Sequence, residues 1–337
     1  MSVRPRPRIR RPAALTGIVA AAALVLSGCA GATQKAATSD WPNKKPITLL
    51  VGFAPGGPAD GAARPLAQSL EKELGTPVEV VNKPGATGQV AYGEIARAKP
   101  DGLTFGMVNY PSFQTSYLDS ARKAGYTRDD FTTLANHVTD ARVLVVQPDA
   151  PFKNLKEFIA AAKREPRKFT AGTAGKGSGA HFSAIQFEDA TGTDLALTHF
   201  AEGSGPSAAA FLGKHIDVLF AGVSDVDQMA KDGTGKVIGV MTEERSEFLP
   251  DVPTFKEQGV NVMESGQRGF VGPAGLPKDI QDKLSAALAK VIKSEENKEA
   301  LRKLGLESHY LDPAQYDADL KASEAKYRGL LPKIGRP

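Results

Sequence analysis

Apolar residues along the chain follow two alternating patterns, short continuous runs and helical repeats. The continuous runs predict strands covered on both faces, because a sheet with one wet face would show strict polar alternation. They lie at 47–53, 78–82, 103–109, 142–147, 168–172, 195–200, 216–222 and 237–242. Helical spacing predicts helices between them, at 60–74, 87–98, 154–164, 179–190, 206–212 and 224–231. The alternation predicts an α/β fold of doubly wound parallel sheets with helices on both faces.

The last part of the chain has a different pattern. From Pro277 onward the apolar spacing is helical, and residues 312–330 form a further helical pattern with no strand pair of comparable strength. The simplest architecture places these C-terminal helices against the domain that the first part of the chain forms. We therefore expect domain 1 to comprise residues 42–141 plus 242–337, and domain 2 to comprise residues 142–241.

The first 28 residues have the pattern of an export signal. Five arginines precede an apolar stretch from Ala13 to Leu26, which is shorter than the ~20 residues that span a bilayer. The stretch ends in LSGC (residues 26–29), which looks like a bacterial lipobox. This predicts a lipid on Cys29, followed by a lipid-anchored linker at 29–41. Arg10-Arg11 leaves the export route open between the general secretory and twin-arginine pathways.

Composition limits the function classes. Cys29 is the only cysteine, so the chain has no intramolecular disulfide or CxxC site. The arginines of the export signal account for the excess of 42 basic over 38 acidic residues, so the mature chain is nearly neutral. The pI of about 8.9 therefore gives no support to nucleic-acid binding. The five histidines are scattered without metal-ligand spacing, so we expect no metal.

Three glycine-rich loops follow predicted strands: PGGPAD (55–60), NKPGATG (82–88) and GTAGKGSGAH (172–181). Ligands of open α/β sheets bind outside the carboxyl ends of the strands, where helix N-termini direct N–H groups at an anion. Gly56 and Gly57 allow the backbone to turn back, and Asp60 can cap the helix that follows. An anion-binding loop and a tight turn with a capped helix both fit this stretch.

The loops lack the motifs of nucleotide binding and covalent catalysis. A P-loop ending at Gly175-Lys176 would need glycine where Thr170 stands and Ser or Thr where Gly177 stands. A nucleophile elbow would need G-x-S-x-G around Ser178. We expect His181, three residues further on, to contact Ser178 as a capping partner or to face a ligand. The chain is predicted to be no enzyme and to bind no cofactor; an exported serine hydrolase using Ser178 and His181 is the rival hypothesis.

Ordered motifs extend from Trp41 to Leu331, nearly the whole mature chain. They are WPNKKPITLLVGFAPGGPADGAAR (41–64), LGTPVEVVNKPGATG (74–88), AKPDGLTFG (98–106), GTAGKGSGAH (172–181), GPSAAAFLGKHIDVLFAG (205–222), LPDVPTFKEQG (249–259) and GPAGLP (272–277). In this order and spacing they resemble the Bug-type extracytoplasmic solute receptors, the substrate-binding proteins of tripartite tricarboxylate transporters.

The resemblance implies a two-domain periplasmic-binding-protein (Venus-flytrap) fold, each domain a mostly parallel sheet flanked by helices. Such a protein closes on a small carboxylate, a di- or tricarboxylate or a related organic acid, and delivers it to a membrane permease. The same fold can also serve as a ligand sensor for a membrane kinase. A monomer without nucleic-acid partners is expected, with closure at a hinge near Arg142 and Met241.

The resemblance also implies which residues bind the ligand, mainly through backbone N–H groups. The first βα loop would contribute Phe53, Gly57, Ala59 and Asp60. The facing loop would contribute Thr173, Ala174, Gly175, Ser178 and His181, with Ser204, Gly205, Ser224 and Asp225 as further wall residues. The side chain of Asp60 is expected to cap the helix and pair with Arg64, because two carboxylates repel each other.

The chain departs from the pattern of this family at two places. Many relatives carry an aromatic residue and then a lysine where this chain has Glu202. The segment Gln267-Arg268-Gly269-Phe270 is similar to the tricarboxylate-type branch, which usually has Trp at the first position. We expect Arg268 to be an exposed arginine on a connecting segment; the alternative is a charge partner for a ligand carboxylate.

Overall fold

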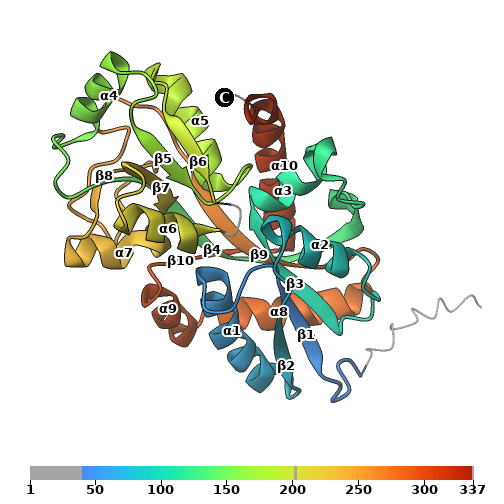
Figure 1. The fold of residues 1–337 in the computed structure, drawn as a ribbon. Helices are drawn as coiled ribbons and strands as arrows, with labels where there is room; N and C mark the ends of the chain where they lie inside the picture. The colour runs from blue at the N-terminus through green and yellow to red at the C-terminus, as the bar shows by residue number, and fades with distance from the viewer. Residues whose placement is uncertain (1–39, 201–202, 336–337) are drawn as a thin grey trace, which may run out of the picture. The chain divides into compact units, whose positions relative to one another are not determined.

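The computed structural model describes residues 40–200 and 203–335, which form ten strands and ten α-helices (Figure 1). The strands are β1 (Ile47–Val51), β2 (Val78–Asn82), β3 (Thr104–Tyr110), β4 (Phe131–Val146), β5 (Thr170–Thr173), β6 (Ala196–His199), β7 (Val218–Gly222), β8 (Lys236–Val240), β9 (Ser265–Pro273) and β10 (Glu307–Leu311). The helices are α1 (Pro58–Leu74), α2 (Gln89–Ala96), α3 (Ser112–Leu118), α4 (Leu155–Arg164), α5 (Gly179–Thr191), α6 (Ser204–Leu212), α7 (Val223–Asp232), α8 (Lys278–Ile292), α9 (Glu295–Arg302) and α10 (Pro313–Leu330). Short 3-10 turns lie at Ala86–Gly88, Ser120–Arg122, Arg128–Asp130 and Leu331–Lys333.

Each strand predicted from the sequence has a counterpart, but the C-terminal part contains strands that were not expected. The sequence predicts no strand pair of comparable strength after Pro277, but β10 lies there and pairs with β4. The sequence also missed β9, the first part of β4 and helix α3. Strand β9 includes three glycines and two long polar side chains (SGQRGFVGP), and β10 reads ESHYL, so neither shows a continuous apolar run.

Strand β4 belongs to two half-sheets. We call β1, β2, β3, β9, β10 and residues 131–141 of β4 the first half-sheet, and β5 to β8 with residues 142–146 of β4 the second. The strand order is β2-β1-β3-β9-β4-β7-β5-β6, with β8 and β10 paired to β4. The α/β class is confirmed. The sheet is mixed, because β9 and β4 run antiparallel to their neighbours, whereas β1–β3 and β5–β7 are parallel as predicted.

The two half-sheets are joined where three segments of backbone meet. The Arg142 N–H donates to the Glu264 carbonyl at 3.1 Å, the Met241 N–H to the Arg142 carbonyl at 2.7 Å, and the Glu264 N–H to the Met241 carbonyl at 2.8 Å. The pairing of β4 changes at Arg142, the residue at which the sequence places the start of domain 2. The division into domains stays a prediction.

Helices cover both faces of each half-sheet. On one face of the first half-sheet, Leu66 of α1 and Leu288 of α8 pack with Phe105 and Phe270 of the strands, all fully buried. Burying each such side chain stabilises the folded state by about 1.5–3 kcal/mol. Helices α8 and α9 pack on α1, and α10 packs on β4 and α3. The C-terminal helices thus cover the first half-sheet, and the turns between strands and helices remain free to form a site.

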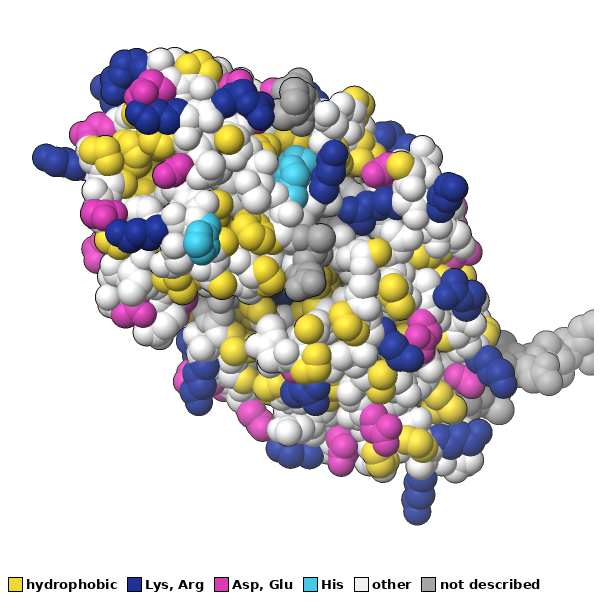
Figure 2. All heavy atoms as spheres, in the orientation of Figure 1, with side chains coloured by type: hydrophobic (Ala, Val, Ile, Leu, Met, Phe, Trp, Pro, Cys, Tyr) yellow, Lys and Arg dark blue, Asp and Glu magenta, His cyan; other side chains and the backbone are white. Residues whose placement is uncertain are grey.

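Within residues 40–200 and 203–335, no helix is long and apolar enough to cross a membrane. The predicted export signal, Cys29, the linker up to Ser39, and Glu202 lie outside the described residues. On the face shown in Figure 2, basic and acidic side chains are interspersed.

Candidate functional site

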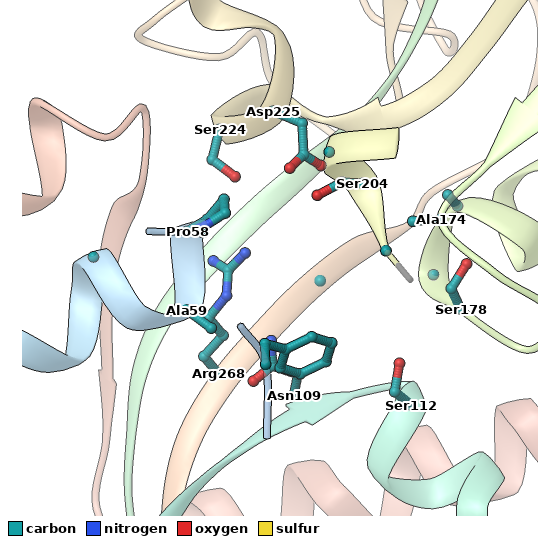
Figure 3. A pocket seen from close by; sticks show the side chains of 18 of the residues that line it. Pro58, Ala59, Asn109, Ser112, Ala174, Ser178, Ser204, Ser224, Asp225 and Arg268 are labelled. Carbon is teal, nitrogen blue, oxygen red and sulfur yellow. The ribbon is translucent and has the colours of Figure 1, made fainter. Parts of the chain in front are cut away.

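A cavity of about 720 Å³ opens where the turns of the two half-sheets face each other (Figure 3). One wall is the loop that follows β1, from Phe53 to Pro58, together with Asn109 to Ser112 at the end of β3. The opposite wall comes from the loops that precede α5, α6 and α7. A volume of this size suits a small molecule with its ordered water.

Helix N-termini converge on this cavity. The first residues of α1, α5, α6 and α7 all line it, as do Pro111 and Ser112 at the start of α3. The first N–H groups of a helix have no partner within the helix and carry partial positive charge. Several such ends at one cavity make a site for an anion.

The loop after β1, residues 53–60, is the first lip of the cavity. Helix α1 begins at Pro58, and Gly57 provides no side-chain cap. Instead, the Asp60 carboxylate accepts hydrogen bonds from the Gly56 N–H, from Arg64 Nε and from Asn82 Nδ2, each at 2.9 Å. The predicted Asp60–Arg64 pair is confirmed at 2.8 Å, and the carboxylate braces the turn from within the first helical turn. Burial opposes the charged form, but these hydrogen bonds outweigh it and lower the pKa of Asp60.

The loop after β5, residues 173–181, is the second lip. Ser178 is the N-cap of α5, and its Oγ accepts the His181 N–H at 3.2 Å, so the predicted capping contact is confirmed. The Nδ1 atom of His181 accepts the Gly177 N–H at 3.0 Å, which places the ring proton on Nε2. Burial, with smaller effects from His199 and Lys176, lowers the pKa of His181 to about 3. His181 is therefore neutral and supports the turn.

Side chains next to the first half-sheet hold the second lip. Thr115 Oγ1 of α3 donates to the Gly177 carbonyl at 3.1 Å, and Arg122 Nη2 donates to the Lys176 carbonyl at 2.7 Å. Gly175 and Gly177 have φ of +109° and +76°, a backbone conformation that favours glycine. The second lip is thus joined by direct hydrogen bonds to α3 and the 3-10 turn after it, which lie beside the first half-sheet.

A buried polar network forms the base of the cavity. Asp140 Oδ2 accepts from Ser224 Oγ at 2.7 Å and from Arg268 Nη2 at 3.2 Å, and Asp140 Oδ1 accepts the Ser224 N–H at 3.2 Å. Asp225 accepts the Gly222 N–H at 3.0 Å and a hydrogen bond from Ser204. Burial and the neighbouring Asp140 raise the pKa of Asp225.

The expectation that Arg268 is exposed on a connecting segment is wrong. Arg268 lies in β9 opposite Asn109 of β3, and its side chain is only 10% exposed. The pairing of β9 with β3 and β4 places it at the cavity, which its local sequence does not reveal.

Most of the predicted binding residues lie in the cavity wall. Those are Phe53, Gly57, Ala59, Ala174, Ser178, Ser204, Gly205, Ser224 and Asp225. The others, Asp60, Thr173, Gly175 and His181, lie behind the wall, where Asp60 and His181 brace the two lips and Thr173 Oγ1 is 2.7 Å from His199 Nδ1. That any of these residues binds a ligand stays a prediction.

The wall residues that sequence reasoning missed include Arg142 and a group at the end of β3. Asn109, Tyr110 and Ser112 lie at the carboxyl end of a parallel strand, so the rule applied to β1 and β5 would have found them. Arg142 was identified only as a chain crossing, yet its side chain also lines the cavity. Among the described residues, no group of three His, Cys, Asp or Glu side chains is placed to hold a metal ion.

The family model described as tripartite tricarboxylate transporter family receptor (TctC) matches residues 62–335. The chain belongs to this family. A curated relative, the UPF0065 protein in the gbd 5′ region of Cupriavidus necator, is 30% identical over 96% of each chain. The Bordetella pertussis protein BugT is 26% identical over 86% of this chain and 90% of its own.

Solved structures of TctC-type receptors share the two-domain fold. A TctC solute-binding protein from Polaromonas superposes with a TM-score of 0.72 at 31% identity, covering 87% of this chain and 99% of its own. The periplasmic binding protein BugD superposes with a TM-score of 0.76 at 28% identity, covering 86% and 97%. MatC from Rhodopseudomonas palustris, solved with bound malate, gives a TM-score of 0.76 at 26% identity, covering 84% and 98%.

Proposed function

We propose that this TctC-family chain is an extracytoplasmic substrate-binding lipoprotein. It captures a small di- or tricarboxylate or a related organic acid and delivers it to the membrane subunits of a tripartite tricarboxylate transporter. The observation that carries the proposal is the convergence of the N-termini of α1, α5, α6 and α7 on one cavity. The family match and the malate bound to the related MatC support the same ligand class.

The wall residues provide mainly backbone donors. In this proposal the N–H groups near Gly57, Ala59, Ala174 and Gly205 bind one ligand carboxylate, directly or through ordered water. Ser178, whose Oγ accepts the His181 N–H, adds a hydroxyl donor, and Ser204 and Ser224 line the wall. Neutral donors bind a carboxylate without a buried counter-ion, which suits a receptor that must also release its ligand. The chain acts as a receptor and carries out no reaction on its ligand.

Closure would bring the two proposed domains together around the ligand. Domain 1 comprises residues 42–141 plus 242–337 and domain 2 comprises residues 142–241, with the hinge where Arg142, Met241 and Glu264 join their backbones. A ligand that touches both lips stabilises the closed state because it makes these contacts together only there.

Lipidation would attach this receptor to the membrane surface. In this proposal Cys29 carries the lipid and residues 29–41 tether a monomeric binding domain. Intact-mass spectrometry of the exported chain is expected to show the added acyl mass, and Cys29→Ser is expected to abolish it. An unmodified Cys29 in the mature protein would contradict the anchor.

Ligand binding can be measured on the chain from Ala30 onward. We expect at least one of citrate, tricarballylate, succinate, malate, glutamate, nicotinate and terephthalate to raise Tm by several degrees, because a ligand at 100 times its Kd adds about 2.7 kcal/mol to stability. Sulfate at the same ionic strength is the control for unspecific anion effects. A flat panel would contradict the proposed carboxylate class.

A further inference from the structure

We propose that Arg268 binds a second acid group of the ligand, so that this receptor selects molecules with two carboxylates over those with one. This inference rests on the proposed function and narrows it. The helix N-termini would hold the first carboxylate, and the guanidinium at the base of the cavity would hold the second.

The strand pairing fixes the position of Arg268. In β9 it lies opposite Asn109 of β3 on one side and Val138 of β4 on the other. Figure 3 shows its side chain reaching from β9 toward Pro58, on the side of the cavity formed by α1. A residue in the central part of a sheet has a defined position, which a specific contact requires.

The guanidinium of Arg268 is incompletely paired. Its Nη2 donates to Asp140, but Nε and Nη1 have no hydrogen-bond partner although the residue is 92% buried, 8% of its surface remaining exposed. Asp140 also accepts two hydrogen bonds from Ser224, so its charge is shared. Arginine keeps its charge in proteins, and a buried charge with idle donors is costly. A structural ion pair alone would leave this cost in place.

A second guanidinium adds to the positive charge at this point. Arg142 lines the same cavity, and its Nε also has no partner. A Cβ added at Gly179 or Gly266 would come within 2.7 Å or 2.2 Å of Arg142 Nη2, so glycine at both positions makes room for this side chain. The two glycines therefore keep a cationic group at the junction of the half-sheets.

Among the described residues, the acidic side chains near the cavity form one ion pair with these arginines, between Asp140 and Arg268. Two other charged residues of the cavity wall have partners of their own: Asp227 is paired with Lys231 at 2.5 Å, and Lys303 is paired with Glu299 at 3.9 Å. Asp225 accepts hydrogen bonds from the Gly222 N–H and from Ser204 rather than from either arginine. Arg142 forms no ion pair with a carboxylate among the described residues, so Asp140 is the one acid paired with either arginine. A second ligand carboxylate would supply the missing anion and accept from the idle donors.

The test compares diacids with their monoamides, which keep the shape but lose one charge. Calorimetric titration with succinate and succinamate, glutarate and glutaramate, and adipate and adipamate measures the selectivity. We expect the best-bound diacid to bind at least about tenfold tighter than its monoamide. In Arg268→Gln we expect the diacid to lose about 30-fold in affinity, while the monoamide changes less than about threefold.

Control variants separate recognition from folding and from overall charge. Arg245→Gln removes one positive charge at an exposed pair outside the cavity, and it is expected to leave the selectivity unchanged. Arg268→Lys keeps the charge with fewer donors and is expected to recover part of the diacid affinity. The wild-type comparison of diacid with monoamide needs no variant, so a poorly folding Arg268→Gln leaves the test intact.

The outcomes distinguish this inference from the proposed function. If the wild type binds a monoamide or monocarboxylate as tightly as the diacid, or if Arg268→Gln weakens both equally, the role of Arg268 is overturned and the carboxylate receptor stands. If no acid of either kind binds, the proposed function itself fails. Selective loss of diacid binding in Arg268→Gln supports both.

Discussion

The two lips of the cavity are built from the same local unit, a strand, a glycine turn and a helix, but they are braced differently. The first lip is held by a charged carboxylate, Asp60, with donors from its own half-sheet. The second is held by neutral groups, Ser178 and His181, and by donors from across the cavity, Thr115 and Arg122. The first lip is therefore braced within its own half-sheet, whereas the second is held partly by the neighbouring half.

The largest expected effect comes from removing the brace of the first lip. Asp60→Ala leaves the Gly56 N–H, Asn82 and Arg64 without their acceptor, and we expect the free energy of unfolding to fall by about 3 kcal/mol. Urea denaturation at pH 7 measures it. The matched control is Asp282→Ala, at an exposed pair with Lys278, where a change within about 0.5 kcal/mol is expected. Equal effects of the two substitutions would show that Asp60 does not brace the turn.

The lips should also differ in their response to acid. The pKa of His181 is lowered to about 3, so between pH 6.5 and 3 the unfolded chain binds more protons and stability falls as the pH falls. At pH 5 the shifted pKa of His181 lowers the free energy of unfolding by about 2 kcal/mol relative to its value above pH 7. The lowered pKa of Asp60 protects the first lip until the pH falls below its ordinary value of 3.8.

A variant isolates the contribution of His181 from those of His137 and His199. His181→Gln keeps an acceptor for the Gly177 N–H but cannot titrate. Between pH 7 and 5, the wild type is expected to lose about 2 kcal/mol more of its unfolding free energy than this variant, since His137 and His199 remain in both. Identical losses in urea denaturation would mean that the ring of His181 is not held neutral by the fold.

The lips also show what could be predicted from the sequence. Both units carry local signals, a continuous apolar run, glycines at the turn and a helical repeat after it, and both were found with the correct boundaries to within a few residues. The cap of α5 at Ser178 was likewise found from its spacing to His181. These features depend on neighbours along the chain.

The base of the cavity could not be predicted in the same way. Arg268 and Asp140 are 128 residues apart, and they meet only because β9 inserts between β3 and β4. Strand β9 has three glycines, which weaken the strand pattern, although Gly269 and Gly266 give the space that Tyr316 and Arg142 occupy. The residues that create room for the site are those that hide its strand from a search for apolar runs.

The smallest expected effect tests whether the second lip depends on the other half. Arg122→Ala removes the donor to the Lys176 carbonyl, worth about 1 kcal/mol, so hydrogen exchange of the amides at 173–178 should be about fivefold faster. The amides at 54–60 should not change. Arg128→Ala is the matched control, because Arg128 is bound to Asp129, Asp317 and Glu324 rather than to the second lip. Equal exchange at 173–178 in wild type and Arg122→Ala would show that the second lip, like the first, is held by its own half alone. The two lips would then differ only in that a charged carboxylate braces the first and neutral side chains brace the second.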